Sequence, residues 1–341
     1  MSYIMLAMGW ILKMCYFLVN NYGVAIILFT VLVKALLLPL TIKQQRSMML
    51  TQKIQPLLQE LQKKYANDKE KLNAETMKLY QKYQVNPMSG CLPMLIQLPL
   101  LMALYFVMRR PVVYLMGFGE DEVWRIVSAV REWAEAVPGG LEQFFQAVDV
   151  KDLETLTASS YKMFGAYEIQ VAEFIHSHPE LLENHWIAET GKTYNIIDFN
   201  FLGINLSATP SFGAMMNLLF GRGGVTLETM LLWTIPVLAG VSSYLVSKIS
   251  QKMQEAPKKE TRMIEEEKTN PMQSMTLMMP LISAWFAFSL PAAVGLYWIV
   301  SNVLQLVQQV VLAKVVKVDL TDEQIEGEIV NVKKNRKKRK K

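Results

Sequence analysis

Long hydrophobic runs, separated by charged segments, dominate the pattern of this chain. The first runs from Tyr22 to Leu40, which is enough for a helix of roughly 20 residues to cross the apolar core of a bilayer. The pattern predicts five transmembrane helices in total, over residues 21–42, 88–108, 227–247, 272–290 and 291–312. We therefore expect an all-α membrane protein.

Residues 1–20 form a further apolar stretch that has three interpretations. A signal sequence should carry a basic start and a small-residue cleavage site, and neither is found here. A span would force a very tight reversal at Asn20-Asn21. We favour an amphipathic helix in the outer interface, with Lys13 and the rings of Trp10, Tyr16 and Phe17 at headgroup level.

Residues 43–87 have helical periodicity with one break. Apolar residues recur at intervals of three and four, stop at Ala66-Asn67-Asp68 and then resume. This predicts a helical hairpin with basic outer faces, which include Lys63 and Lys64. The hairpin is either a solvated connector or a platform that recruits anionic lipid or an incoming partner.

Charge is distributed unevenly and predicts the orientation. Residues 41–87 hold nine Lys/Arg and four Asp/Glu, whereas residues 109–226 hold eight and fifteen. By the positive-inside tendency the former are cytoplasmic, and 109–226 is an extracytoplasmic insertion. The N-terminus is then extracytoplasmic, residues 248–271 form a second cytoplasmic loop, and the C-terminus is cytoplasmic in a multi-pass protein of the cell membrane.

The insertion carries amphipathic patches at 123–133 and 168–186, which predict short helices. It also holds His176, His178 and His185, but no cysteine lies near them, so we expect no metal site. No cofactor is expected either. The two cysteines, Cys15 and Cys91, fall on opposite sides of the predicted membrane and imply no disulfide.

Lys34 lies inside the first span. It is seven residues from Thr41, or roughly 10 Å below the end of the helix. An ammonium at that depth costs about 2.5–3.5 kcal/mol on insertion scales, so it either snorkels to the interface or faces water or a partner. Thr30 lies one turn before Lys34 on the same face, which favours a hydrated site.

Other polar residues lie within the predicted spans. Gln97 is the one amide of the second span and serves either as a contact between helices or as a contact for a substrate. The last span carries a polar stripe at spacings of three and four, formed by Trp298, Ser301, Asn302, Gln305 and Gln309. Together with Lys34 and Thr30 they suggest a shared hydrophilic face in the inner half of the bilayer.

Residues 313–341 form a basic cytoplasmic tail. Its last eleven residues, 331–341, hold eight Lys/Arg and no acid, with Lys337, Lys338 and Arg339 at the centre. Such a run is disordered until it meets a polyanion. Ribosomal RNA and the anionic leaflet are candidate partners, and the tail having no specific partner is a third interpretation.

Three blocks of this chain resemble the YidC/Oxa/Alb family of membrane protein insertases. They are NYGVAIILFTVLVKALLLPLTIKQQRS (21–47), NPMSGCLPMLIQLPLLMALY (86–105) and FAFSLPAAVGLYWIVSNVLQLVQQ (286–309). The resemblance covers residues 4–108 and about 227–312. A Gram-positive type is expected, because the large periplasmic domain that Gram-negative relatives place before the core is missing.

This resemblance implies a groove that is open to the cytoplasm and to lipid and closed on the outer side. A nascent membrane protein is drawn into the groove and released into the bilayer, with or without the Sec translocon. The family's groove charge, usually arginine, falls on Lys34, which keeps the cation but loses the planar five-donor fork. The insertion at 109–226 is a large expansion of the family's short outer loop.

Two other functions are tested against the same residues. An intramembrane protease needs a nucleophile and base or paired carboxylates, but the predicted spans contain no His and only Glu228 as an acid, at a boundary. We therefore expect no enzyme. A secondary transporter or channel that uses Lys34 as an anion or coupling site is the alternative, although no internal repeat is found.

Overall fold

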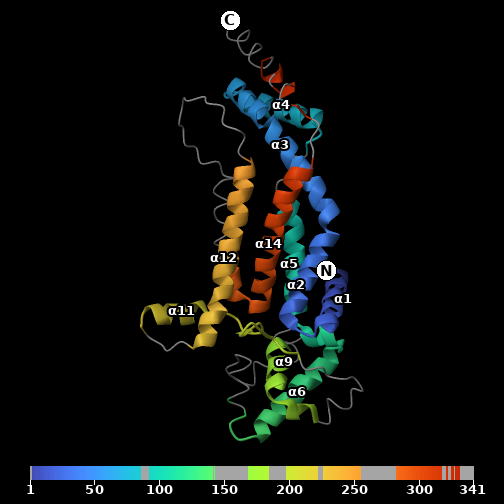
Figure 1. Cartoon of the computed structure of the whole chain (residues 1–341), viewed down its shortest axis with the longest axis vertical. Helices are drawn as coiled ribbons and strands as arrows, with labels where there is room; N and C mark the ends of the chain where they lie inside the picture. Colours follow the sequence, from blue (N-terminus) through green and yellow to red (C-terminus); the bar gives the residue numbers. More distant parts are fainter. Residues whose placement is uncertain are drawn as a thin grey trace. The chain divides into compact units, whose positions relative to one another are not determined.

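The computed structural model describes residues 2–85, 92–140, 142, 168–183, 197–221, 226–254, 282–316, 320–321, 324–325 and 327–330. Almost all of its elements are helices (Figure 1). The chain divides into two compact units. The first unit comprises residues 1–33, 98–243 and 278–302, and the second comprises 34–97, 244–277 and 303–341.

Two helices of the described part are long and apolar enough to cross a membrane. They are α12 (Leu227–Gln254) and α14 (Ala292–Val315). A third candidate is the pair α2 (Tyr22–Leu36) and α3 (Leu38–Lys64), if this bent pair counts as one span. The helix α5 (Leu92–Arg109) lies in the predicted second span, 88–108, and ends one residue beyond it. Of the predicted fourth span, only residues 282–290 are described. The count of five spans therefore stays a prediction.

Local sequence explains where α2 begins and why it ends early. Asn20 adopts φ of 47°, and the Asn21 side chain accepts a 3.0 Å hydrogen bond from the backbone N–H of Val24, which caps the helix. Pro39 has no backbone N–H to donate and stands in the first turn of α3, where none is needed. The chain bends by 59° between α2 and α3, within the range 21–42 predicted as one span.

In the first unit, α1 (Ser2–Val19) packs on η2 (Val112–Met116), a short π-helical stretch. Met8, Leu12, Cys15 and Tyr16 form the buried face of α1. The other side of α1 exposes Leu6, Trp10 and Phe17, among others. The residues predicted to lie in an interface are therefore helical, and one side of that helix exposes apolar side chains.

The part of the insertion that the structure describes contains two packed helices, α6 (Glu120–Ala136) and α9 (Glu168–Ser177), followed by the 3-10 helix η4 (Pro179–Glu183) (Figure 1). The two predicted short helices are thus confirmed. Trp133 of α6 meets Phe174 of α9 edge to face, with ring centroids 5.8 Å apart, and His178 stacks on Phe174 at 4.3 Å. His178 is therefore part of the packing, while His185 lies outside the described residues.

A two-stranded antiparallel sheet follows, made by β1 (Asn200–Phe201) and β2 (Ile204–Asn205). Its turn residues Leu202 and Gly203 both have positive φ, as a tight hairpin turn requires. Phe201 packs so closely on Gly23 that a Cβ there would lie 2.3 Å from the ring. This contact explains why α2 has a glycine in its first turn.

The helix α11 (Phe212–Leu219) follows the sheet. Residues between the sheet and α11 also bind the first turn of α14 through backbone hydrogen bonds. The backbone N–H of Ala292 donates to the carbonyl of Ala208 at 2.8 Å, and that of Ala293 donates to Leu206 at 3.0 Å. The first N–H groups of a helix have no partner within it. The chain after the sheet therefore supplies acceptors for two of them.

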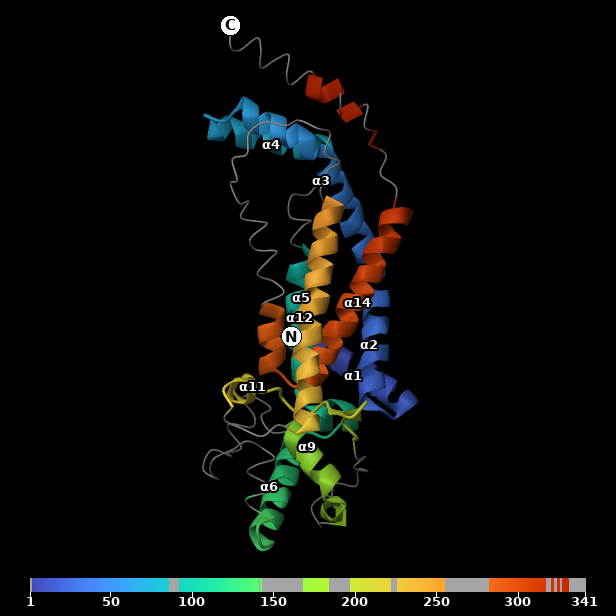
Figure 2. The same cartoon turned by 60° about the vertical axis from the view of Figure 1, so that its left-hand side comes forward.

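The second unit contains the α3–α4 pair, formed by α3 and α4 (Lys69–Lys82) (Figure 2). The two helices flank the predicted break, and Asp68 caps α4 by accepting a 3.1 Å hydrogen bond from the N–H of Lys71. Apolar residues from both helices form its core, with Ile54, Leu57, Leu58, Leu61, Tyr65 and Leu79 among them. The helical period seen in the sequence corresponds to this buried face.

Candidate functional site

The polar stripe of α14 meets serines of α12 in the first unit. The side-chain amide of Asn302 donates to the hydroxyls of Ser242 and Ser243, at 2.9 Å each. Ser242 in turn donates to the carbonyl of Ala239 at 3.0 Å, and all three polar side chains are buried. Both amide hydrogens of Asn302 therefore have partners, and this residue joins two helices.

A second contact of the same kind lies two turns further along both helices, in the second unit. Gln309 donates through its amide nitrogen to the hydroxyl of Ser250 at 2.9 Å. The partners are 59 or 60 residues apart in both contacts, so the residue numbers rise in the same direction along α12 and α14. The side-chain oxygen of Gln309 is buried with no hydrogen-bond partner in the described part of the chain.

Lys34 stands in the last turn of α2 and is half-buried. Within the described ranges its ammonium has no carboxylate within ion-pair distance. Thr30, one turn before, is fully buried, and its hydroxyl donates to the carbonyl of Ile26 at 2.6 Å. Lys34 is thus a cation in an apolar helix with no anionic partner among these residues, whereas the hydroxyl of Thr30 is satisfied within its own helix.

The other predicted site residues have varied surroundings. On α14, Ser301 is buried, Gln305 is half-buried, and the half-buried Trp298 stacks on Phe286 with ring centroids 6.4 Å apart. Trp298, Ser301 and Asn302 belong to the first unit, while Lys34 and Gln305 belong to the second. Gln97 lies in α5, but its side chain is outside the described residues, as are Lys337, Lys338 and Arg339.

A buried ion pair that the sequence did not predict joins Arg110, at the start of the insertion, to Glu168. Glu168 of α9 is fully buried, and one of its oxygens accepts from Arg110 at 3.2 Å while the other accepts from the N–H of Val113 at 2.8 Å. This carboxylate therefore ties α9 to η2. The partners are 58 residues apart, so no periodicity in the sequence could have indicated the pair.

A second carboxylate links α9 to the sheet. Glu173 accepts a 3.1 Å hydrogen bond from the Asn205 amide of β2. Burial raises the pKa of Glu173 above its usual value, and the nearby His176 counteracts part of that rise. Among the described residues, no group of three or more His, Cys, Asp or Glu side chains is placed so that it could hold a metal ion.

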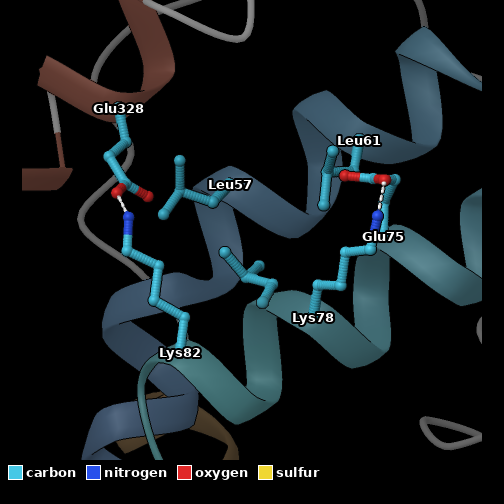
Figure 3. Close-up of a pocket in the computed structure, with 7 residues that line it drawn as sticks. Leu57, Leu61, Glu75, Lys78, Lys82 and Glu328 are labelled. Atoms are coloured by element: carbon cyan, nitrogen blue, oxygen red, sulfur yellow. Dashed lines mark hydrogen bonds and ion pairs between the residues drawn. The ribbon is translucent and has the colours of Figure 1, made fainter.

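The second unit holds a pocket of about 170 Å³ on the surface of the α3–α4 pair (Figure 3). Its walls come from α3, α4 and the stretch near the C-terminus, and its lining residues are Leu57, Leu61, Glu75, Lys78, Leu79, Lys82 and Glu328. Lys78 pairs with Glu75 at 2.8 Å, and Lys82 pairs with Glu328. Its lining therefore combines three leucines with two ion pairs.

Comparison with known proteins bears on this architecture. The family model described as 60Kd inner membrane protein matches residues 14–319, which is most of the chain. The chain belongs to this family. The resemblance to the YidC/Oxa/Alb family is thereby confirmed, and family and apolar helices together make it a multi-pass membrane protein. Membership also agrees with the expectation that the chain is not an enzyme.

Three relatives illustrate how far the likeness extends. A protein of Caldanaerobacter subterraneus is 29% identical over 317 residues, which cover 93% of this chain and 97% of the relative. A protein of Fusobacterium nucleatum is 52% identical over 95 residues, 28% of this chain and 46% of the relative. One of Clostridium tetani is 53% identical over 129 residues, 38% and 57% respectively. Each bears the name membrane protein insertase YidC.

Proposed function

We propose that this chain is a membrane protein insertase, which receives nascent membrane proteins and releases their hydrophobic segments into the bilayer. The observation that carries the proposal is the match, along nearly the full length of both chains, to a relative named membrane protein insertase YidC. The shorter matches bear the same name at higher identity. The family model spans the same core.

The proposed mechanism uses a hydrophilic groove with Lys34 as its cation. Placing an ammonium in an apolar helix costs about 2.5–3.5 kcal/mol, a cost that is reduced when water or an anion reaches it. Lys34 is half-buried and, in the part of the chain that is described, has no carboxylate partner. It is thus available to attract acidic side chains of an entering polypeptide.

The remaining groove residues take different roles in this proposal. Ser301, Gln305 and Trp298 offer polar and aromatic contacts along α14, and Gln97 adds an amide from α5. Thr30 and Asn302 have their hydrogen bonds satisfied within the protein, so they shape the helices that carry the groove rather than bind substrate. Lys34 is then the main electrostatic contact.

Recruitment is assigned to the basic segments outside the spans. The side chain of Lys63 on α3 is 62% exposed, and Lys64 follows it at the end of the same helix. With the basic tail, including Lys337, Lys338 and Arg339, they provide phosphate contacts for a ribosome or for anionic lipids. In this proposal the chain acts either alone or beside a Sec translocon.

Depletion of the chain in cells tests the function directly. After depletion, we expect the segments of small single- and double-spanning membrane proteins that normally cross the membrane to stay on the cytoplasmic side, where protease added from outside does not reach them. A plasmid copy of the chain should restore their insertion. Normal insertion in depleted cells would overturn the proposal. If Lys34 instead served a transporter, depletion would impair uptake of an anion while insertion continued.

A further inference from the structure

The stretch just before the basic tail packs on the α3–α4 pair. Ile325 is 5% exposed and belongs to the same hydrophobic cluster as Leu57, Leu61 and Leu79. Leu320 and Ile329 lie partly buried against this cluster. Apolar side chains from near the C-terminus therefore help to cover the core of the α3–α4 pair.

Polar contacts fix the position of this stretch at both ends. The ammonium of Lys53 on α3 donates to the backbone carbonyl of Leu320. At the other end, the carboxylate of Glu328 pairs with Lys82 of α4, and the two side chains point toward each other beside the pocket (Figure 3). Lys53 belongs to α3 and Lys82 to α4, so each helix of the pair contributes one polar contact to the stretch.

Local sequence favours a helix here. Thr321 and Gln324 exchange hydrogen bonds, from the N–H of Thr321 to the Gln324 side chain at 3.2 Å and from the N–H of Gln324 to the Thr321 hydroxyl at 3.4 Å. This is the reciprocal arrangement of a capping box. Ile325, Glu328 and Ile329 are then three and four residues apart and share one helical face.

Charge complements the apolar contact. Residues 319–328 contain five acidic side chains and no basic one. Residues 41–87, which include most of α3 and all of α4, hold nine basic and four acidic ones. An acidic helix on a basic surface gains from this difference, although salt reduces the gain at exposed positions.

We propose that the described residues 320–321, 324–325 and 327–330 form a latch: a segment of this chain that docks against the apolar core of the α3–α4 pair. The basic run 331–341 follows Val330 directly, so the latch fixes the start of the tail at that pair. This inference does not rest on the insertase function.

The test measures hydrogen–deuterium exchange of the full-length chain in nanodiscs that each hold a single copy. In Ile325→Asp, a carboxylate replaces a buried apolar side chain, and we expect amides of residues 54–61, 79–85 and 324–330 to exchange more than about tenfold faster. Ile325→Leu is the matched control, because it keeps the apolar volume. Peptides from α12 serve as an internal reference for an intact membrane part.

Charge reversal tests the ion pair separately. Lys82→Glu or Glu328→Lys alone should speed exchange of the latch about two- to fivefold, as expected of a partly exposed pair, and the double variant should restore slow exchange. The latch is refuted if Ile325→Asp exchanges like Ile325→Leu, or if neither reversal has an effect. Protection that occurs only in nanodiscs with several copies would overturn the proposal by assigning the docked segment to a second chain.

Discussion

Removing the carboxylate of Glu168 should loosen the described part of the insertion far more than removing a surface carboxylate. Glu168 is fully buried and the side chain of Arg110 is only 11% exposed, so their pair is shielded from water. Taking one partner from a buried pair typically costs about 3–5 kcal/mol, because the remaining charge stays in a low-dielectric site. Glu168→Ala also removes the acceptor of the Val113 N–H.

The surface pair between Arg131 and Glu135 on α6 provides the matched control. Its side chains are 38% and 41% exposed, and Nε of Arg131 lies 2.9 Å from Oε1 of Glu135. Pairs of this kind on helices contribute only about 0.3–0.5 kcal/mol to stability. Glu135→Ala should therefore have little effect. The double variant Arg110→Met with Glu168→Leu should be less damaging than Glu168→Ala, since it removes both charges of the pair.

The assay is hydrogen–deuterium exchange of η2 and α9, which reports local opening without requiring the whole membrane protein to unfold reversibly. A loss of about 3 kcal/mol in the free energy of local opening corresponds to roughly a hundredfold faster exchange, where the opening equilibrium sets the exchange rate. If Glu168→Ala and Glu135→Ala change exchange of α9 equally, the buried carboxylate does not hold α9 to η2.

Three further predictions concern other parts of the chain. Lys34→Arg should keep insertion of substrates with acidic translocated tails, and Lys34→Glu should abolish it; equal protease protection for both variants would contradict the electrostatic role. Deleting residues 331–341 should weaken co-sedimentation with ribosomes at low salt, and binding that stays unchanged would remove the tail from recruitment. Gly23→Ala would place a Cβ 2.3 Å from the Phe201 ring. It should destabilise the sheet by about 1–3 kcal/mol, seen as faster exchange in residues 199–206, and Ala25→Gly serves as the control for a change in helix propensity.

The sequence predicted the helical character of the chain well, because helical period and hydrophobic length are local properties. The break at 66–68 separates α3 from α4, and the amphipathic patches at 123–133 and 168–186 correspond to α6 and to α9 with η4. The bend after Leu36 was harder to predict, since Pro39 is compatible with both a continuous span and a new first turn.

For the candidate site, the sequence could name polar residues but not their partners. The stripe at 298–309 indicated a face, yet only the packed helices show that Asn302 meets Ser242 and Ser243 and that Gln309 meets Ser250. The local sequence around an amide side chain is the same whether that amide is buried against serines of another helix or contacts a substrate. Partners about 60 residues apart leave no periodic signal to tell these roles apart.

By itself, the sequence determined that this is a helical membrane protein with a cation inside its first apolar run and a strongly basic end, because hydropathy and charge are sums over neighbouring residues. Only the tertiary structure decided which of its charges are paired. It buried Glu168 beside Arg110, and it seated Ile325 in the core of the α3–α4 pair. Which charges pair and which side chains are buried depends on contacts between segments distant in the sequence. Such contacts form only when packing removes the side chains from water.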